Sequence, residues 1–154
     1  MHFITYFLLS FFAVLISFED MKSHRIRNNY LLCFFSLLSV ANILVGKLQE
    51  QLFSGFLMFF IFTIFYAVTL SFPKKATMGF GDIKLISVIS FGYFEPTFRT
   101  FELFFLLLWL GLLIHICVLL ISQRKIVTRI PMAPSIFLAA GLYLFTPIAL
   151  LLPQ

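Results

Sequence analysis

Charged residues are scarce in this sequence, and their scarcity excludes most classes of protein. Asp, Glu, Lys and Arg make up 11% of the 154 residues, whereas 62% are hydrophobic, and the mean hydropathy is +1.08. A soluble globular domain carries about 25% charged residues, and a disordered chain is poor in apolar ones. The composition therefore indicates a membrane protein.

Cysteine is almost absent too. Cys33 and Cys117 lie singly inside apolar stretches, so they can form neither a disulfide framework nor a four-ligand zinc site, and we expect small core residues. The sequence predicts no metal site and no cofactor. The net charge of +5 does not indicate a nucleic-acid partner, because such binding needs clustered Lys and Arg on a soluble surface.

The hydrophobic residues form six long apolar stretches: Met1–Phe18, Asn29–Val45, Leu52–Phe72, Ile83–Phe94, Leu103–Ile121 and Ser135–Gln154. About 20 apolar residues cross a bilayer as a helix, whereas barrel strands are about half as long. In hydrocarbon, only helices and closed barrels pair every backbone polar group. We predict an all-α polytopic membrane protein, in which residues 1–154 form a single membrane-embedded bundle of six transmembrane helices.

The positions of the basic residues predict the orientation of this bundle. If all six stretches cross, the loops 19–28, 73–82 and 122–134 share one side. Together with the side chain of Lys84, which can extend to the same surface, they hold nine of the eleven cations: Lys22, Arg25, Arg27, Lys74, Lys75, Lys84, Arg124, Lys125 and Arg129. Cytoplasmic loops carry the excess of Lys and Arg, so we predict both termini outside the cytoplasm.

Three of the six carboxylates fall on the predicted cytoplasmic side. Glu19 and Asp20 follow the first stretch, and Asp82 precedes the fourth; the others are expected as solvated charges in the outer loops (Glu50, Glu95 and Glu102). Helix packing can bring Asp20 and Asp82 together at one membrane depth. Two neighbouring carboxyls share a proton, which provides a base to activate water and an acid to polarise a carbonyl.

Two glycines precede Asp82, at positions 79 and 81. Glycine adopts backbone angles closed to other residues and carries no side chain, so an extended peptide could approach the main chain here. An alternative interpretation is a flexible hinge before a helix, with Asp82 as its N-cap. The spacing alone does not separate these two interpretations.

The run Gly79-Phe80-Gly81-Asp82-Ile83-Lys84-Leu85 resembles the Gly-x-Gly-Asp-x-Lys-Leu signature of the type IV prepilin peptidases, a family of membrane aspartic proteases. The segment from Asp20 to Asn28 is similar to the family's upstream motif, an Asp followed six to eight residues later by Ile-Pro-Asn. Ile26 and Asn28 match, and Arg27 stands where the family usually has Pro, so we expect a less rigid turn. A weaker similarity, at residues 129–134, covers the entry to the last helix.

The resemblance implies an endopeptidase of the bacterial inner membrane that removes short basic leaders from prepilins or pseudopilins at the cytoplasmic face, for type IV pili or protein secretion. It implies Asp20 and Asp82 as the catalytic pair, supported by Gly79 and Gly81. Larger members of the family carry a cysteine tetrad and also methylate the new amino terminus with S-adenosylmethionine. This sequence has no tetrad, so we expect peptidase activity without methylation.

Two further polar residues, Glu19 and His115, each allow two interpretations. Glu19 is a candidate contact for a leader Lys or Arg, because the basic cytoplasmic face would otherwise repel a basic leader; a solvated helix-end charge is the plainer interpretation. His115, inside the fifth stretch, is more simply explained by a hydrogen bond between helices than by catalysis.

The chief alternative function is a small ion- or proton-coupled transporter using the same carboxylates, since intramembrane acids mark such pathways as well. A non-catalytic assembly factor of the same fold is a second alternative. Both carboxylates lie at one face rather than at the midplane, and the sequence has no evident internal symmetry, which favours the peptidase.

Overall fold

The computed structural model describes residues 2–71, 78–123 and 130–145. Within these residues, six helices follow one another: α1 (His2–Ser23), α2 (Asn28–Val45), α3 (Leu48–Leu70), α4 (Phe80–Tyr93), α5 (Phe98–Gln123) and α6 (Ala133–Phe145). The described residues include no strand, so the predicted all-α fold is confirmed. Five of the nine predicted cytoplasmic cations lie outside the described residues: Lys74, Lys75, Arg124, Lys125 and Arg129.

In the described part of the chain, three helices, α2, α3 and α5, are long and apolar enough to cross a membrane. Many of their large apolar side chains are exposed, among them Leu32, Phe56 and Leu106, as expected of surfaces that contact lipid. By contrast, α4 and α6 have 14 and 13 residues. At 1.5 Å per residue, α4 spans about 20 Å, less than the hydrocarbon core of about 30 Å. The structure is that of a helical membrane-type protein, and six full crossings stay a prediction.

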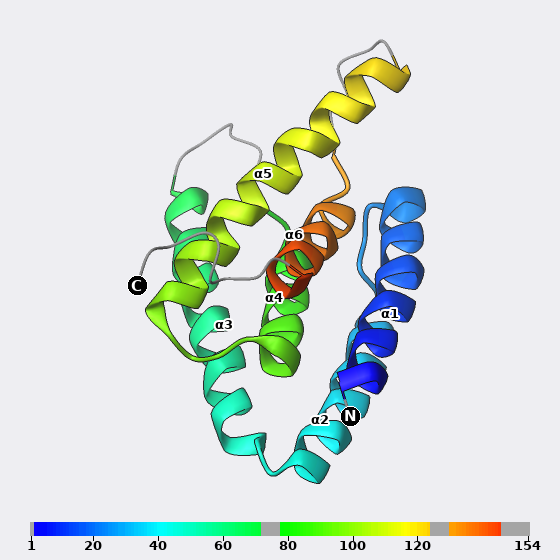
Figure 1. Ribbon diagram of the computed structural model, residues 1–154. Helices are drawn as coiled ribbons and strands as arrows, with labels where there is room; N and C mark the ends of the chain where they lie inside the picture. Colours follow the sequence, from blue (N-terminus) through cyan, green and yellow to red (C-terminus); the bar gives the residue numbers. More distant parts are fainter. Residues whose placement is uncertain (1, 72–77, 124–129, 146–154) are drawn as a thin grey trace.

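Helix α4 lies at the centre of the bundle, packed against α2, α3 and α6 (Figure 1). Half of its 14 residues are buried: Asp82, Ile83, Leu85, Ile86, Ile89, Ser90 and Phe91. The C-terminal end of α1 and the N-terminal ends of α4 and α6 point to one end of the bundle, while the α2–α3 and α4–α5 connections lie at the other (Figure 1). The two sequence motifs, at residues 20–28 and 79–85, therefore lie at the first of these ends.

Buried polar contacts fix the position of α4 along its neighbours. Asn42 of α2 donates its amide N–H to the carbonyl oxygen of Phe91 at 2.9 Å, and the hydroxyl oxygens of Ser54 on α3 and Ser90 lie 2.8 Å apart. Hydrogen bonds between membrane helices contribute about 0.6–2 kcal/mol each. These contacts hold the far end of α4, so its first turn has a defined depth.

Charged residues lie farther inside the helices than we expected. α1 continues to Ser23, so Glu19 and Asp20 are helical, and the first connection is reduced to residues 24–27. Glu50 and Glu102 lie in α3 and α5 rather than in loops, whereas Glu95 does lie in the α4–α5 connection. The predicted helix ends were placed at the first charge, but charged side chains near a helix end extend to water without ending the helix.

The two cysteines are a second correction. Cys33 and Cys117 are both exposed and free, so the expectation that they are small core residues is wrong. Both lie on helices long enough to cross a membrane, and an apolar run has no periodicity that distinguishes its lipid-facing side from its buried side.

Gly55 tests the packing of α3 on α4. A Cβ at this position would lie 2.9 Å from the Cβ of Phe91 and 3.1 Å from the carbonyl oxygen of Ser87. We expect Gly55→Ala to separate the helices and lower the free energy of unfolding by about 1–3 kcal/mol. Gly141→Ala is the matched control, because its Cβ would meet nothing within 4 Å. Unfolding in detergent, followed by circular dichroism, should rank Gly55→Ala well below the control; equal stabilities would contradict this packing.

Candidate active site

Asp20 is held in place by the ends of two helices. α1 ends where His24 adopts a positive φ of 50° and donates its backbone N–H to the carbonyl oxygen of Asp20 at 2.8 Å. The Asp20 side chain is buried, at 4% exposure, and its Oδ2 accepts the backbone N–H of Ala133, the first residue of α6, at 3.0 Å. The first N–H groups of a helix have no partner within it. Asp20 therefore caps α6 from another helix.

Asp82 caps its own helix. Gly79 is the N-cap of α4 and donates its backbone N–H to Oδ2 of Asp82 at 3.0 Å, while the backbone N–H of Asp82 returns to the carbonyl of Gly79 at 3.0 Å. The alternative with Asp82 as N-cap is thus wrong: Asp82 is the third helical residue and its carboxyl turns back. The side chain is buried, at 8% exposure.

The two motif glycines provide space rather than unusual backbone angles. Gly79 has φ −72°, and Gly46 is the single glycine with positive φ in the described part of the chain. Our expectation of special angles at Gly79 and Gly81 is therefore wrong. A Cβ on Gly79 would lie 3.0 Å from Oδ2 of Asp82, and one on Gly81 would lie 3.4 Å from the Cβ of Ile26. The glycines let the carboxyl and the α1–α2 connection approach closely.

The two motifs are in direct contact. Ile26 lies against Gly81, and Nζ of Lys84 donates to Oδ1 of Asn28 at 3.1 Å, with the ammonium group 5.2 Å from the centre of the Phe80 ring. Lys84, which we expected to extend to the surface, thus also joins α4 to the start of α2. Residues 56 apart in sequence are held together.

The carboxyls of Asp20 and Asp82 interact electrostatically. Asp82 lies at the end of the bundle, immediately before the apolar run that begins at Ile83. Burial raises the pKa of the Asp82 carboxyl, the negative charge of Asp20 raises it further, and the Gly79 N–H acts in the opposite direction. A carboxyl with a raised pKa retains its proton and can act as an acid, while a charged neighbour can act as a base.

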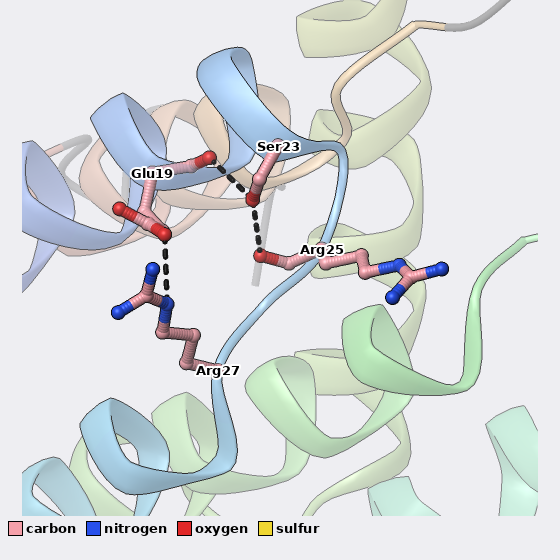
Figure 2. A network of polar contacts seen from close by, with 4 residues as sticks. All are labelled: Glu19, Ser23, Arg25 and Arg27. Carbon is pink, nitrogen blue, oxygen red and sulfur yellow. Dashed lines mark hydrogen bonds and ion pairs between the residues drawn. The ribbon is translucent and has the colours of Figure 1, made fainter.

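Glu19 lies beside the pair and is already engaged. Its Oε1 is 2.8 Å from Nε of Arg27, and the Glu19 side chain is 17% exposed, against 64% for Arg27. The Ser23 hydroxyl lies within hydrogen-bonding distance of the carbonyl oxygens of Glu19 and Arg25, at 2.9 and 3.1 Å, and its one proton serves one of them at a time. Figure 2 shows this network around the end of α1.

Sequence reasoning missed Ser135. The His115 Nδ1 lies 2.8 Å from the Ser135 hydroxyl, in the first turn of α6, so the interpretation as a hydrogen bond between helices is confirmed. Ser135 is buried and lies two residues after Ala133. A lone serine at the start of an apolar stretch was the available signal. Ala133 acts through its backbone N–H, which every residue other than proline has.

No group of three His, Cys, Asp or Glu side chains that could hold a metal ion occurs within residues 2–71, 78–123 and 130–145. The described part of the site consists of carboxyls, backbone N–H groups and a serine–histidine pair. Asp20 and Asp82 are two buried carboxyls that interact electrostatically, and such a pair can supply the acid and the base that hydrolysis requires.

Comparison with known families agrees with this chemistry. The model of the type IV leader peptidase family matches residues 7–152. The chain belongs to that family, which is a family of proteases, and the resemblance inferred from two short motifs is confirmed over nearly the whole chain. Comparisons with curated proteins and with solved structures found no match.

The charge of Asp20 provides a test of the pair. Asp20→Asn removes one cause of the raised Asp82 pKa, so Asp82 should ionise at a lower pH than in the unmodified protein. Burial, the larger cause, should still keep its pKa above that of an exposed aspartate. The measurement is a ¹³C NMR titration of labelled aspartate in micelles, with Asp82→Asn identifying the signal. An unchanged or higher midpoint in Asp20→Asn would show that the two carboxyls do not interact.

Proposed function

We propose that this chain is an aspartic endopeptidase that removes the short basic leader from type IV prepilins or pseudopilins, with Asp20 and Asp82 as its catalytic pair. The observation that carries the proposal is the meeting of the two motifs. Asp20 and Asp82, separated by 61 residues, are both buried and interact electrostatically. Membership of a leader peptidase family supports prepilin-type substrates.

In the proposed mechanism, Asp20 takes a proton from water as the water oxygen bonds to the scissile carbonyl carbon. Asp82, whose raised pKa favours its protonated form, donates its proton to the carbonyl oxygen. The tetrahedral intermediate then collapses: Asp20 returns its proton to the amide nitrogen, Asp82 recovers a proton from the hydroxyl, and the C–N bond breaks. The products are the leader carboxylic acid and the free amine of the mature protein.

Conservative substitution separates the chemistry from the caps. Asn retains an acceptor oxygen for Ala133 or Gly79 but cannot exchange a proton, so Asp20→Asn and Asp82→Asn should each lower turnover by about 10²–10⁴-fold. Glu102→Gln, at an exposed position on α5, is the control and should cleave normally. The assay incubates purified protein with a prepilin and sequences the new amino terminus. Full activity in both Asp variants would refute the mechanism.

The transporter alternative would give ion flux in liposomes that depends on the same two carboxylates, without cleavage.

Methyl transfer to the new amino terminus is a separate activity. The 154 residues contain two cysteines, so this chain does not itself supply a cysteine tetrad, and we propose that cleavage proceeds without cofactor. A methylated product formed by this protein alone, detected by mass spectrometry, would contradict that part of the proposal.

We further propose that all six helices cross the inner membrane as one domain, with both termini outside and the Asp pair at the cytoplasmic face. The cations Lys22, Arg25, Arg27 and Lys84 at that end support the orientation, because cytoplasmic segments are enriched in Lys and Arg. Lipid is the expected partner of the exposed apolar faces of α2, α3 and α5.

Cysteine labelling tests this orientation. After replacement of Cys33 and Cys117 by Ser, a membrane-impermeant maleimide should label Gln49→Cys in intact cells. It should label Lys22→Cys only after the cells are permeabilised, because both positions are exposed but lie at opposite ends of the bundle. The reverse labelling pattern would place the Asp pair outside the cytoplasm.

A further inference from the structure

Arg27 has a backbone suited to proline and a side chain that proline lacks. Its φ is −71°, close to the value of about −65° that a proline ring imposes. The path of the chain into α2 thus does not require arginine. What arginine adds is a guanidinium group on Glu19, one residue before Asp20, through a single Nε–Oε1 contact of 2.8 Å (Figure 2).

The two members of this ion pair differ in their need for each other. Glu19 is 17% exposed, whereas Arg27 is 64% exposed. A largely buried carboxylate requires a cation or hydrogen-bond donors, because leaving it unpaired costs free energy. Arg27 can instead return to water, and an ion pair whose cation stays largely in water contributes only about 0–1 kcal/mol. A second cation can therefore replace Arg27 at little cost, while Glu19 keeps a partner throughout.

We propose that Arg27 occupies the leader-binding carboxylate of the empty protein, and that a Lys or Arg of the substrate leader displaces it and pairs with Glu19. This inference rests on the proposed leader cleavage and names Glu19 as a specificity-determining residue with Arg27 as its internal competitor. Asp20 and Asp82 are committed to catalysis and to capping helices, so Glu19 is the carboxylate at this end that remains for recognition.

The proposed leader-binding carboxylate, Glu19, is next to the catalytic residue Asp20 on α1. Adjacent residues of a helix point about 100° apart: Asp20 turns to the start of α6, and Glu19 turns to the start of α2. A leader that lies along this end of the bundle in an extended conformation can present one side chain to Glu19 and its scissile bond to the Asp pair, because successive residues of an extended chain point in different directions. The preferred leader cation should thus lie a few residues before the scissile bond.

Arg25 provides a matched control. It is exposed in the same connection, two residues from Arg27, and Figure 2 shows its side chain pointing away from Glu19. Removing either arginine lowers the positive charge of this face by one unit. Only removal of Arg27 frees Glu19, so any difference between the two variants reports competition for that carboxylate rather than bulk repulsion.

The experiment measures KM and kcat of the full chain in liposomes. The substrates are a prepilin with one leader Arg and its counterpart with Gln at that position. Arg27→Gln should lower KM for the basic leader about two- to fivefold, the gain expected on removing a weak competing ion pair, and leave the neutral leader unchanged. Arg27→Pro, which keeps the backbone path, should do the same, whereas Arg25→Gln should leave KM unchanged.

Glu19→Gln should raise KM for the basic leader and abolish the difference between the two leaders. The proposal is overturned if Arg27→Gln and Arg25→Gln behave alike. It is also overturned if Arg27→Gln impairs both leaders and Arg27→Pro restores them, since that result shows a structural clamp. Absence of cleavage of either leader by the unmodified protein refutes the proposed function itself.

Discussion

The candidate site depends on a hydrogen bond between two helices that are far apart in the sequence. The first residue of α6 donates its backbone N–H to Asp20 of α1. An unpaired N–H at the start of a buried helix is costly where water is scarce, and α6 is short and buried. The position of α6 is therefore tied to the end of α1. The same bond orients the carboxyl that we assign as the base.

A similar cap at the start of α4 holds the second carboxyl of the pair. Asp82 turns back to the N–H of Gly79, so each aspartate caps the start of a buried helix, one in its own helix and one from outside. Partial positive charge at helix starts stabilises nearby carboxylates. Capping and catalysis are thus not competing explanations for these residues. The caps hold two carboxyls at one end of the bundle, where burial and the negative charge of Asp20 raise the pKa of Asp82 and favour its protonated form.

Sequence reasoning could place Asp20 and Asp82 at one end because charge and hydropathy alternate along the chain in a simple way. It could not find the N–H of Ala133, since a backbone donor leaves no mark in a sequence. The Ser135–His115 and Glu19–Arg27 contacts depend on how helices rotate about their axes, which uniformly apolar runs do not encode. Helix ends were misplaced at Glu19 and Glu102 for a related reason. A charged residue favours a position near the membrane surface, but it does not end a helix.

The basic end of the bundle raises the question of how a basic leader could approach it. Screening limits exposed charges to about 8 Å at physiological salt, so the net charge of +5 acts weakly on an incoming chain. Contacts at the surface decide instead. Lys84 is held by Asn28 and the Phe80 ring, and Arg27 by Glu19, so two of the cations nearest the motifs already have partners. A cation of the leader can then take the place of Arg27 on Glu19. Arg27 returns to water, so no unpaired charge is added to the site.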